Sequence, residues 1–449
     1  MNNNILNTQP IPKLIRTLAI PASIGFFFNT MFNVVDTYFA GMISTQALAA
    51  LSLSFPVFFI IIALGSGLST GATAVIANAL GAGRDREVQV LSLQTIILGI
   101  VLSAGLTVAG LIASPPLFIL LGASEKYLHM CLSYMNTIFA GTVGFIFAYT
   151  FNAILNATGD TRSFRNFLIL GFFGNIILDP WFIFGGFGIP AMGIVGVAFS
   201  TVLIELLGSV YLGLRVHHTG MLSGCTLRDC LPQLHALNEI IRQGFPAALN
   251  LMTVGIGIFV ITYFISAFGK EAVAAYGIAV RIEQIVLLPT IGLNVATLTL
   301  VSYSNGARLF DRIEETLRTA LRYGGACMGV GGLTVFILAA ACMRIFTHDT
   351  TVIAIGSTYL RIDALALYAY VILFVHVSAL QGIKRPAFAV FIGLFRQIIA
   401  PAMVFAVLTH VLGFGLLGIW WGICSITWCA ALMTFGYSRR LLKRVPHLS

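Results

Sequence analysis

Charged side chains are scarce in this sequence. Asp, Glu, Lys and Arg make up only 9% of its 449 residues, whereas a typical soluble domain carries about 25%. Hydrophobic residues make up 58% of the chain, and the mean hydropathy is +0.96. So few charges cannot cover a water-facing surface, which excludes an ordinary soluble globular domain.

The sequence also lacks the short motifs of nucleotide-driven or hydrolytic chemistry. It contains no phosphate-binding GxxxxGK[ST] loop, no GxSxG nucleophile elbow and no HExxH pair. Its seven cysteines show no CxxC spacing, so we interpret them as small apolar side chains with free thiols. We therefore expect neither enzymatic activity nor a bound cofactor or redox metal.

Long apolar runs are what the sequence has instead. Runs of roughly 20 to 30 residues recur along it, each long enough to cross a hydrocarbon core as a helix. The first run lacks a signal-peptide cleavage site, so it is expected to remain as a membrane helix. The sequence predicts an all-α integral membrane protein with twelve transmembrane helices, near residues 14–41, 46–79, 91–121, 127–157, 164–185, 191–215, 239–267, 272–304, 318–343, 354–381, 388–412 and 416–437.

The basic residues predict an orientation. The net charge of +9 is spread over short turns between the apolar runs rather than gathered in one patch, which argues against a nucleic-acid partner. Nineteen Lys and Arg residues fall in turns on the side of the termini, and three fall on the other side: Lys126, Lys270 and Arg344. Lys and Arg concentrate on the cytoplasmic side of membrane proteins. Both termini are therefore expected in the cytoplasm.

Two halves of the chain repeat each other. A shift of 225 positions aligns IPASIGF (20–26) with FPAALNL (245–251), and later matches pair Pro180 with Pro401. The longest polar stretch, 216–238, lies between the halves and is interpreted as a cytoplasmic linker. We expect two six-helix lobes, 1–215 and 239–449, related by pseudo-two-fold symmetry about an axis along the membrane normal. Such repeats favour transport over catalysis.

Few ionisable residues lie inside the apolar runs, where each is costly and needs a reason. At 1.5 Å per residue, Asp36, Asp179 and Thr201 all fall about 9–15 Å below the outer surface. Asn175 lies four residues before Asp179 and shares its helix face, while Pro180 is expected to free backbone carbonyls. Carboxylate, amide and hydroxyl oxygens suit H⁺ or Na⁺. The sequence predicts an ion-coupling site here, and the energy source is then an ion gradient.

Other intramembrane charges are weaker candidates. Glu205 lies four residues after Thr201 and extends the same polar face. Arg281 and Glu283 are two residues apart and cannot face each other on one helix, so we assign them a structural or gating role, with direct substrate contact as the alternative. The repeat places Ile261 and Ala400 where the first half has its two Asp. The expected ion chemistry is therefore confined to the N-terminal lobe.

These stretches resemble a known family. IPASIGFFFNTMFNVVDTYFAG, GIAVRIEQIVLLPTIGLNVATLTLVSYSNGA and NAILNATGDTR are similar to the multidrug and toxic compound extrusion (MATE) antiporters, and the likeness covers nearly the whole chain. Within the family the chain resembles the bacterial and archaeal DinF-like branch, whose coupling carboxylates lie in the N-terminal half. The NorM-like branch has acids in its seventh and tenth helices, where this chain has Val254 and Tyr370.

The resemblance implies a function and a location. It implies export of cationic or amphipathic drugs in exchange for H⁺ or Na⁺ by alternating access, by a monomer in contact with lipids of the bacterial or archaeal cytoplasmic membrane. A lipid or oligosaccharide flippase of the same superfamily is the nearest alternative. An intramembrane enzyme that uses the Asp pair and an ion channel are more distant ones.

Overall fold

The computed structural model describes residues 4–120, 122–123, 125–186 and 188–444. Long helices dominate, and the part described contains no strand beyond an isolated bridge between Gly186 and Ile189. Ten of the described helices are long and apolar enough to cross a membrane, and two bent helix pairs raise the count to as many as twelve. The protein is thus an all-α integral membrane protein, as the sequence predicts.

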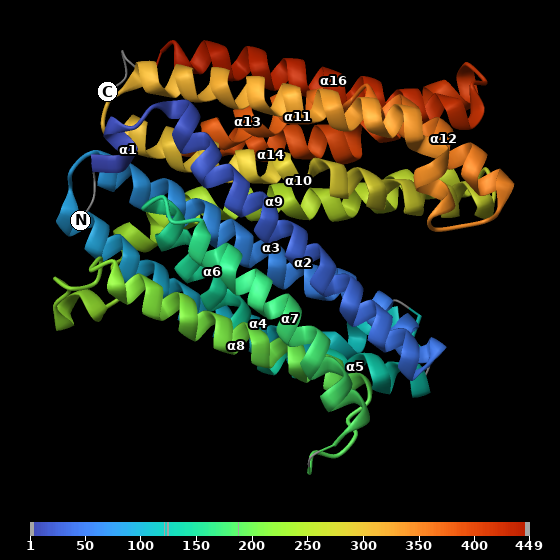
Figure 1. Ribbon diagram of the computed structural model, residues 1–449, viewed down its shortest axis with the longest axis horizontal. Coiled ribbons are helices and arrows are strands. Elements are labelled where there is room, and N and C mark those ends of the chain that lie inside the picture. Colours follow the sequence, from blue (N-terminus) through green and yellow to red (C-terminus); the bar gives the residue numbers. More distant parts are fainter. Residues whose placement is uncertain (1–3, 121, 124, 187, 445–449) are drawn as a thin grey trace. The chain divides into compact units, whose positions relative to one another are not determined.

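The helices follow the predicted order (Figure 1). In the first half they are α1 (Asn4–Thr8), α2 (Ile11–Ile43), α3 (Thr45–Gly81), α4 (Asp85–Leu120), α5 (Glu125–Ala140), α6 (Thr142–Ala157), α7 (Arg162–Phe184) and α8 (Ile194–His218). The second half has η1 (Leu227–Cys230), α9 (Leu234–Ser266), α10 (Lys270–Gly306), α11 (Phe310–Arg344), α12 (Thr350–Ala364), α13 (Leu367–Gly382), α14 (Ala387–Leu394), η2 (Phe395–Ile399), α15 (Ala400–Ala406), η3 (Val407–Val411) and α16 (Gly415–Leu442).

Three predicted spans are interrupted. α5 and α6 meet at Gly141 with a bend of 46°, and α12 and α13 meet with a bend of 52°. The predicted helix 388–412 remains a single span, but its regular α-helix is interrupted by the two π-helical turns η2 and η3. Such π-turns are frequent at functional sites, so these breaks direct attention to particular places in the fold.

Tertiary packing divides the chain into two compact units. The first contains Ile24–Ala248, and the second contains Ile5–Ser23 together with the residues from Leu249 onward. Both boundaries fall inside helices, α2 and α9, shortly after Pro21 and Pro246. The predicted lobes 1–215 and 239–449 are defined differently, by the six membrane helices expected in each half of the chain. The division into these lobes stays a prediction.

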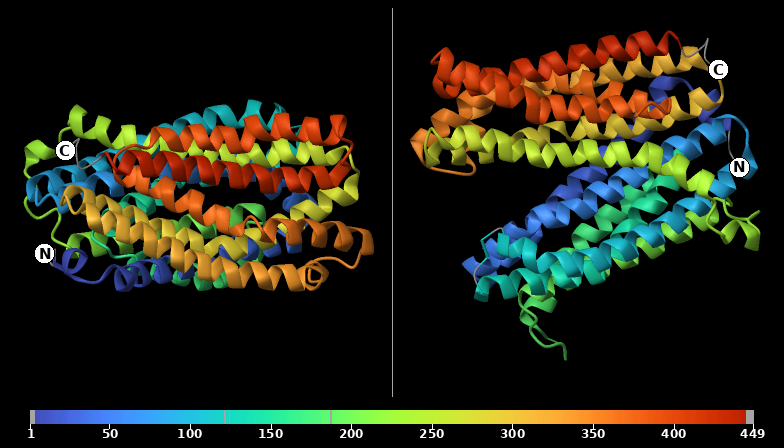
Figure 2. Two further views of the ribbon diagram at one scale, coloured as in Figure 1. Left: turned by 90° about the horizontal axis from the view of Figure 1, so that it is seen from above. Right: turned by 180° about the vertical axis from the view of Figure 1, so that it is seen from behind.

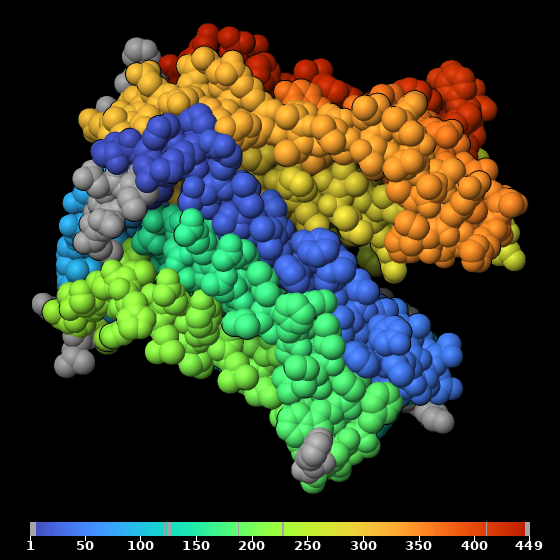
Figure 3. Space-filling model, in the orientation of Figure 1, coloured from blue at the N-terminus to red at the C-terminus, as the bar shows by residue number. Residues whose placement is uncertain are grey.

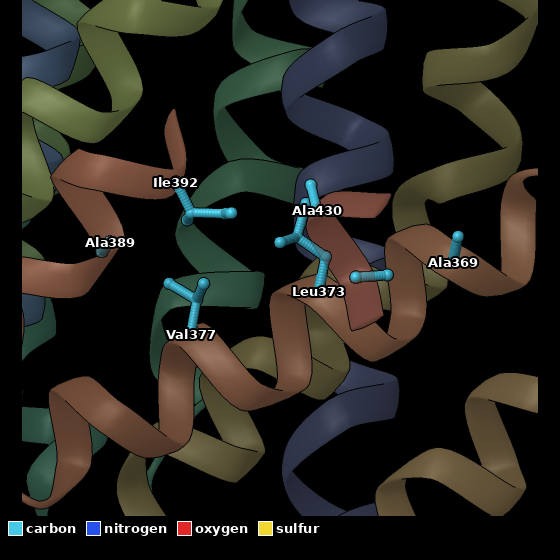
Figure 4. Close-up of a cluster of buried hydrophobic side chains, with 7 residues drawn as sticks. Ala369, Leu373, Val377, Ala389, Ile392 and Ala430 are labelled. Atoms are coloured by element: carbon cyan, nitrogen blue, oxygen red, sulfur yellow. The ribbon is translucent and has the colours of Figure 1, made fainter. Parts of the chain in front are cut away.

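Each unit has an apolar interior and an apolar outer surface. In the second unit, side chains of α13, α14 and α16 form a buried cluster that includes Leu373, Val377 and Ile392 (Figure 4). In the first unit, α7 and α8 lie side by side on one face (Figure 3), and Leu170 and Ile177 are each 66% exposed there. Exposed side chains of this kind suit contact with lipid rather than with water.

Glycines allow one close helix contact in each unit. A Cβ added to Gly67 of α3 would lie 2.7 Å from the carbonyl oxygen of Gly244 in α9. A Cβ on Gly292 of α10 would lie 2.3 Å from the carbonyl oxygen of Ala19 in α2. The repeat shift of 225 positions relates Gly67 to Gly292 and Ala19 to Gly244. The two units therefore contain the same backbone contact, and small residues make it possible. Figure 2 shows the long helices of the chain from two further directions.

The segment between α8 and α9 is bound to the start of α4. Arg86 forms an ion pair of 2.5 Å with Asp229 and donates to the carbonyl of Gly224 at 2.7 Å. The buried Gln94 donates to the carbonyl of Asp229 at 2.8 Å and accepts from the backbone N–H of Gln233 at 2.9 Å. Residues 219–233 thus pack on the first unit as a fixed strap.

Candidate functional site

The four predicted ion-coupling residues converge in the first unit. Asp36 lies on α2, Asn175 and Asp179 on α7, and Thr201 on α8. All four are buried: Asn175 and Asp179 are fully inaccessible, and Asp36 and Thr201 are 7% and 4% exposed. Residues separated by up to 165 positions in sequence therefore meet in one buried polar cluster among three helices.

The amide of Asn175 bridges the two carboxyl groups. Its Nδ2 donates to Oδ1 of Asp36 at 2.8 Å and to Oδ1 of Asp179 at 3.0 Å. The hydroxyl of Thr201 lies 3.5 Å from Oδ2 of Asp36 and donates to the carbonyl of Val197 at 2.9 Å. The spacing of four residues on α7 places Asn175 and Asp179 on one helix face, so a single side chain can hold both acids.

Several oxygens at the site have no hydrogen-bond partner. In the part of the chain that the structure describes, Oδ1 of Asn175 and Oδ2 of Asp179 are buried and unpartnered. Pro180 lies inside α7 and has no N–H, which leaves the carbonyl of Ile176 without its helical donor. Buried polar atoms without partners are costly. A small cation or a proton bound here would use them.

Ser200 is a member of the site that the sequence analysis missed. It is fully buried on α8, and its hydroxyl donates to Oδ1 of Asp179. Thr201, the next residue, contacts Asp36 instead. Two consecutive hydroxyl residues in GVAFSTV were the available signal. Adjacent residues on a helix point about 100° apart, so the sequence does not predict that Ser200 and Thr201 both face the site. The structure shows that they do, because α8 lies between the two acids.

Glu205 extends this polar surface without joining the hydrogen bonds. It lies one turn beyond Thr201 on α8 and packs against α6, where a Cβ on Gly144 would be 3.3 Å from its own Cβ. Among the described residues, no hydrogen bond or ion pair joins the carboxylate of Glu205 to Asp36 or Asp179. Its role as an extension of the ion site stays a prediction.

The other predicted charges separate in space. Arg281 is exposed on α10, whereas Glu283 is half-buried and accepts a hydrogen bond of 2.7 Å from the hydroxyl of Tyr359. From the sequence, Arg361 and Asp363 are predicted to lie together at a solvated helix end. That interpretation holds for Arg361, which is exposed, but is wrong for Asp363, which is 4% exposed. Its helix, α12, packs against both α10 and α11.

His, Cys, Asp and Glu side chains do not cluster as they do at a typical metal site. Among the described residues, no group of three or more of them could hold a metal ion. The oxygens of Asp36, Asn175, Asp179 and Thr201 instead form a hard, oxygen-only donor set, which suits an alkali cation or a proton.

This combination of membrane-spanning helices, internal repeat and buried acids defines a class: an integral membrane transporter. The family model described as MatE matches residues 21–181 and again 246–407, so both halves match separately. The chain belongs to the MATE family. Because MATE proteins are transporters, the expectation that the protein is not an enzyme is confirmed.

Relatives and solved structures agree with this assignment. The chain is 28% identical over 430 residues to a probable multidrug resistance protein NorM of Thermotoga maritima, covering 94% of this chain and 91% of the relative. It is 28% identical over 397 residues to a FAD transporter of Shewanella oneidensis, covering 88% and 87%. A multidrug resistance MATE family transporter solved in an outward-facing conformation matches with a TM-score of 0.92, 26% identity and 99% of both chains.

Proposed function

We propose that the protein is a secondary active antiporter that exports small cationic or amphipathic molecules in exchange for H⁺ or Na⁺. The observation that carries the proposal is the buried pair Asp36 and Asp179, bridged by Asn175 at 2.8 and 3.0 Å. Two carboxylates in a membrane interior are costly unless a cation or a proton compensates them. Occupancy of the site therefore changes the energy of the surrounding helices.

The coupling follows from competition for negative charge. With H⁺ or Na⁺ bound at Asp36 and Asp179, the site attracts a cationic substrate weakly. When the ion leaves, the uncompensated carboxylates favour the substrate cation instead. A ligand shifts a conformational equilibrium only through such a difference in affinity between states. Thr201 and Asn175 supply the neutral oxygens that a partly dehydrated Na⁺ needs.

The position of the acids favours the DinF-like branch. Both acids lie in the first unit, whereas Val254 and Tyr370 occupy the places where the NorM-like branch carries acids. We further propose that the protein works as a monomer in the cytoplasmic membrane of a bacterium or archaeon, with both termini in the cytoplasm and lipids as its surroundings. The bias of Lys and Arg toward one set of turns supports this orientation.

Reconstitution into proteoliposomes tests the proposal. A proton gradient and a sodium gradient are imposed separately, and efflux of a fluorescent organic cation is recorded. We expect one of the two gradients to drive efflux, and Asp36→Asn to abolish that dependence. Equal efflux with and without either gradient would overturn the antiport proposal.

A further inference from the structure

A cavity lies in the second unit, whereas the ion site belongs to the first. Its volume is about 150 Å³, and its walls are mainly aliphatic and aromatic. The charged groups that line it are Glu283 of α10 and Arg396 of the π-helical turn η2. Sites for drug-sized ligands usually measure about 300–1,000 Å³. This cavity therefore suits a ligand, or part of one, of about one ring.

The cavity is the repeat counterpart of the ion site. The alignment that pairs Pro180 with Pro401 also pairs Asn175 with Arg396, and Asp36 pairs with Ile261. Ile261, Arg396 and Pro401 all line the cavity. A guanidinium thus stands where the first half has the amide that bridges two acids. Because a fixed positive charge repels a small cation, the cavity is not a second copy of the ion site.

Arg396 is available to an anionic group. Its Cζ lies 5.3 Å from the centre of the Tyr370 ring, an arrangement that holds the planar guanidinium against an aromatic wall. None of the ion pairs found in the described part of the chain involves Arg396 or Glu283. A guanidinium can bind a carboxylate through two parallel hydrogen bonds.

Glu283 is available to a cationic group. Its carboxylate accepts from the Tyr359 hydroxyl at 2.7 Å, and Tyr359 is held by edge contacts with Trp420 at 4.9 Å and Tyr276 at 5.6 Å. Asp363 lies one turn from Tyr359 on the same helix face, and its Oδ1 is buried without a partner among the described residues. Asp363 is not among the residues that line the cavity, so a cationic group there would mainly offset the cost of desolvating Glu283.

We infer that this cavity binds a small aromatic zwitterion, with its ammonium group at Glu283, its carboxylate at Arg396 and its ring on the aromatic wall. Arg396 and Glu283 already attract each other, so a ligand with only one charge would compensate one of them at the expense of that attraction, whereas a zwitterion compensates both. The cavity therefore discriminates by the presence of both charges. As a substrate subsite the inference rests on the proposed export function and names a substrate class for it.

Equilibrium dialysis of the purified full-length protein in detergent tests the inference. The probes share one ring: 4-(aminomethyl)benzoate carries both charges, 4-methylbenzylamine only the positive one and 4-methylbenzoate only the negative one. Phenylalanine serves as a second zwitterion whose charges are closer together. We expect at least one zwitterion to bind about tenfold more tightly than both singly charged probes, since a hydrogen bond to a charged group contributes about 1.5–3 kcal/mol.

Two variants assign the charges. Arg396→Gln should reduce zwitterion affinity to that of 4-methylbenzylamine, and Glu283→Gln should reduce it to that of 4-methylbenzoate. Arg361→Gln, an exposed residue on α12, is the matched control and should change neither. If a variant does not fold, the relative affinities of the four probes for the wild-type protein still test the inference.

Three results would overturn the inference: no binding of either zwitterion at millimolar concentration, equal binding of 4-methylbenzylamine and both zwitterions, or unchanged selectivity in folded Arg396→Gln and Glu283→Gln. Asp36→Asn should retain zwitterion binding, because it lies in the other unit. Wild-type protein that binds a zwitterion but shows no gradient-driven efflux would count against the antiport proposal alone. Wild-type protein that shows gradient-driven efflux but binds no zwitterion would count against this subsite alone.

Discussion

Asp36 and Asp179 offer the sharpest test at the scale of single residues. Asn keeps the size of Asp but cannot hold a negative charge, so Asp36→Asn and Asp179→Asn should fold normally and export slowly. An interaction with a charged group contributes about 1.5–3 kcal/mol, which corresponds to a fall in initial efflux rate of about tenfold or more. The measurement is gradient-driven efflux in proteoliposomes that contain equal amounts of each protein.

A purely structural Asp would behave differently. A neutral amide costs less to bury than a carboxylate, so Asn at a structural position would leave efflux unchanged and raise thermal stability. Arg361→Gln, on an exposed side chain, controls for handling and reconstitution. Normal efflux by both Asn variants would exclude this pair as the ion site and would make Glu205 the next candidate.

The residue scale shows where sequence reasoning succeeds and where it fails. Helix depth and the i,i+4 spacing predicted that Asp36, Asn175 and Asp179 meet, because these depend on regular helix geometry. Ser200 was missed, and the prediction that Asp363 is solvated is wrong, because the surroundings of both residues depend on which helices pack against α8 and α12. A single sequence does not show which helices pack together. The structure shows it through the burial of side chains and through buried oxygens that have no hydrogen-bond partner.

At the scale of helices, Gly292 tests the close contact between α10 and the first part of α2. A Cβ at this position would lie 2.1 Å from Oγ of Ser23 and 2.3 Å from the carbonyl oxygen of Ala19. Backbone cannot move aside cheaply, so Gly292→Ala should lower the melting temperature in detergent. A strained contact in a packed core costs about 1–3 kcal/mol, and thermal unfolding followed by fluorescence measures the loss.

Gly277 on the same helix supplies the matched control. A Cβ there meets nothing within 4 Å, and Ala favours helix over Gly by up to about 1 kcal/mol. Gly277→Ala should therefore leave the melting temperature unchanged or raise it. Equal melting temperatures for the two variants would show that the structure overstates how closely α10 approaches α2.

The strap between α8 and α9 gives a prediction with a pH dependence. Hydrogen bonds from the backbone N–H and hydroxyl of Thr226, followed by Arg86, lower the pKa of Asp229 below its usual range. A lowered pKa in the folded state means that the strap is stabilised above the unfolded Asp pKa of about 3.9. This stabilisation is lost only as pH falls through the lower folded value.

Hydrogen–deuterium exchange of residues 224–233 measures this effect. Asp229→Asn should exchange faster at neutral pH, because it removes the ion pair with Arg86. Glu314→Gln breaks an ion pair with Arg318 whose side chains are 76% and 61% exposed, and exposed pairs contribute little. That control should exchange as the wild type does. Unchanged exchange in Asp229→Asn would mean that Gln94 alone holds the strap.

Helix positions were easier to predict than helix breaks. Every predicted span has a counterpart in the structure, since runs of apolar residues depend only on composition. The bends after Ala140 and Ala364 and the π-turn at Arg396 have no composition signal. They arise from how neighbouring helices pack, which a single sequence does not reveal.

At the scale of the whole molecule, orientation is the most direct prediction. The excess of Lys and Arg on one side places Ser44, between α2 and α3, on the outer face of the cell. In a variant whose seven native cysteines are replaced, Ser44→Cys should react with a membrane-impermeant maleimide in intact cells. Ser223→Cys, at an exposed position in the strap, should react only after permeabilisation. The opposite pattern would reverse the topology.

The unit boundaries inside α2 and α9 have a consequence for how the two halves of the gene depend on each other. Ile5–Ser23 is encoded in the first half and packs within the second unit. The start of α9, up to Ala248, is encoded in the second half and packs within the first unit. Each half therefore contributes a helical segment to the unit formed mainly by the other half, as in a domain-swapped dimer. Two separately expressed fragments, cut within the strap, would each lack a piece of its unit and would need to be made together. Joining them in one chain makes the exchange intramolecular, so assembly no longer depends on the concentration of a partner.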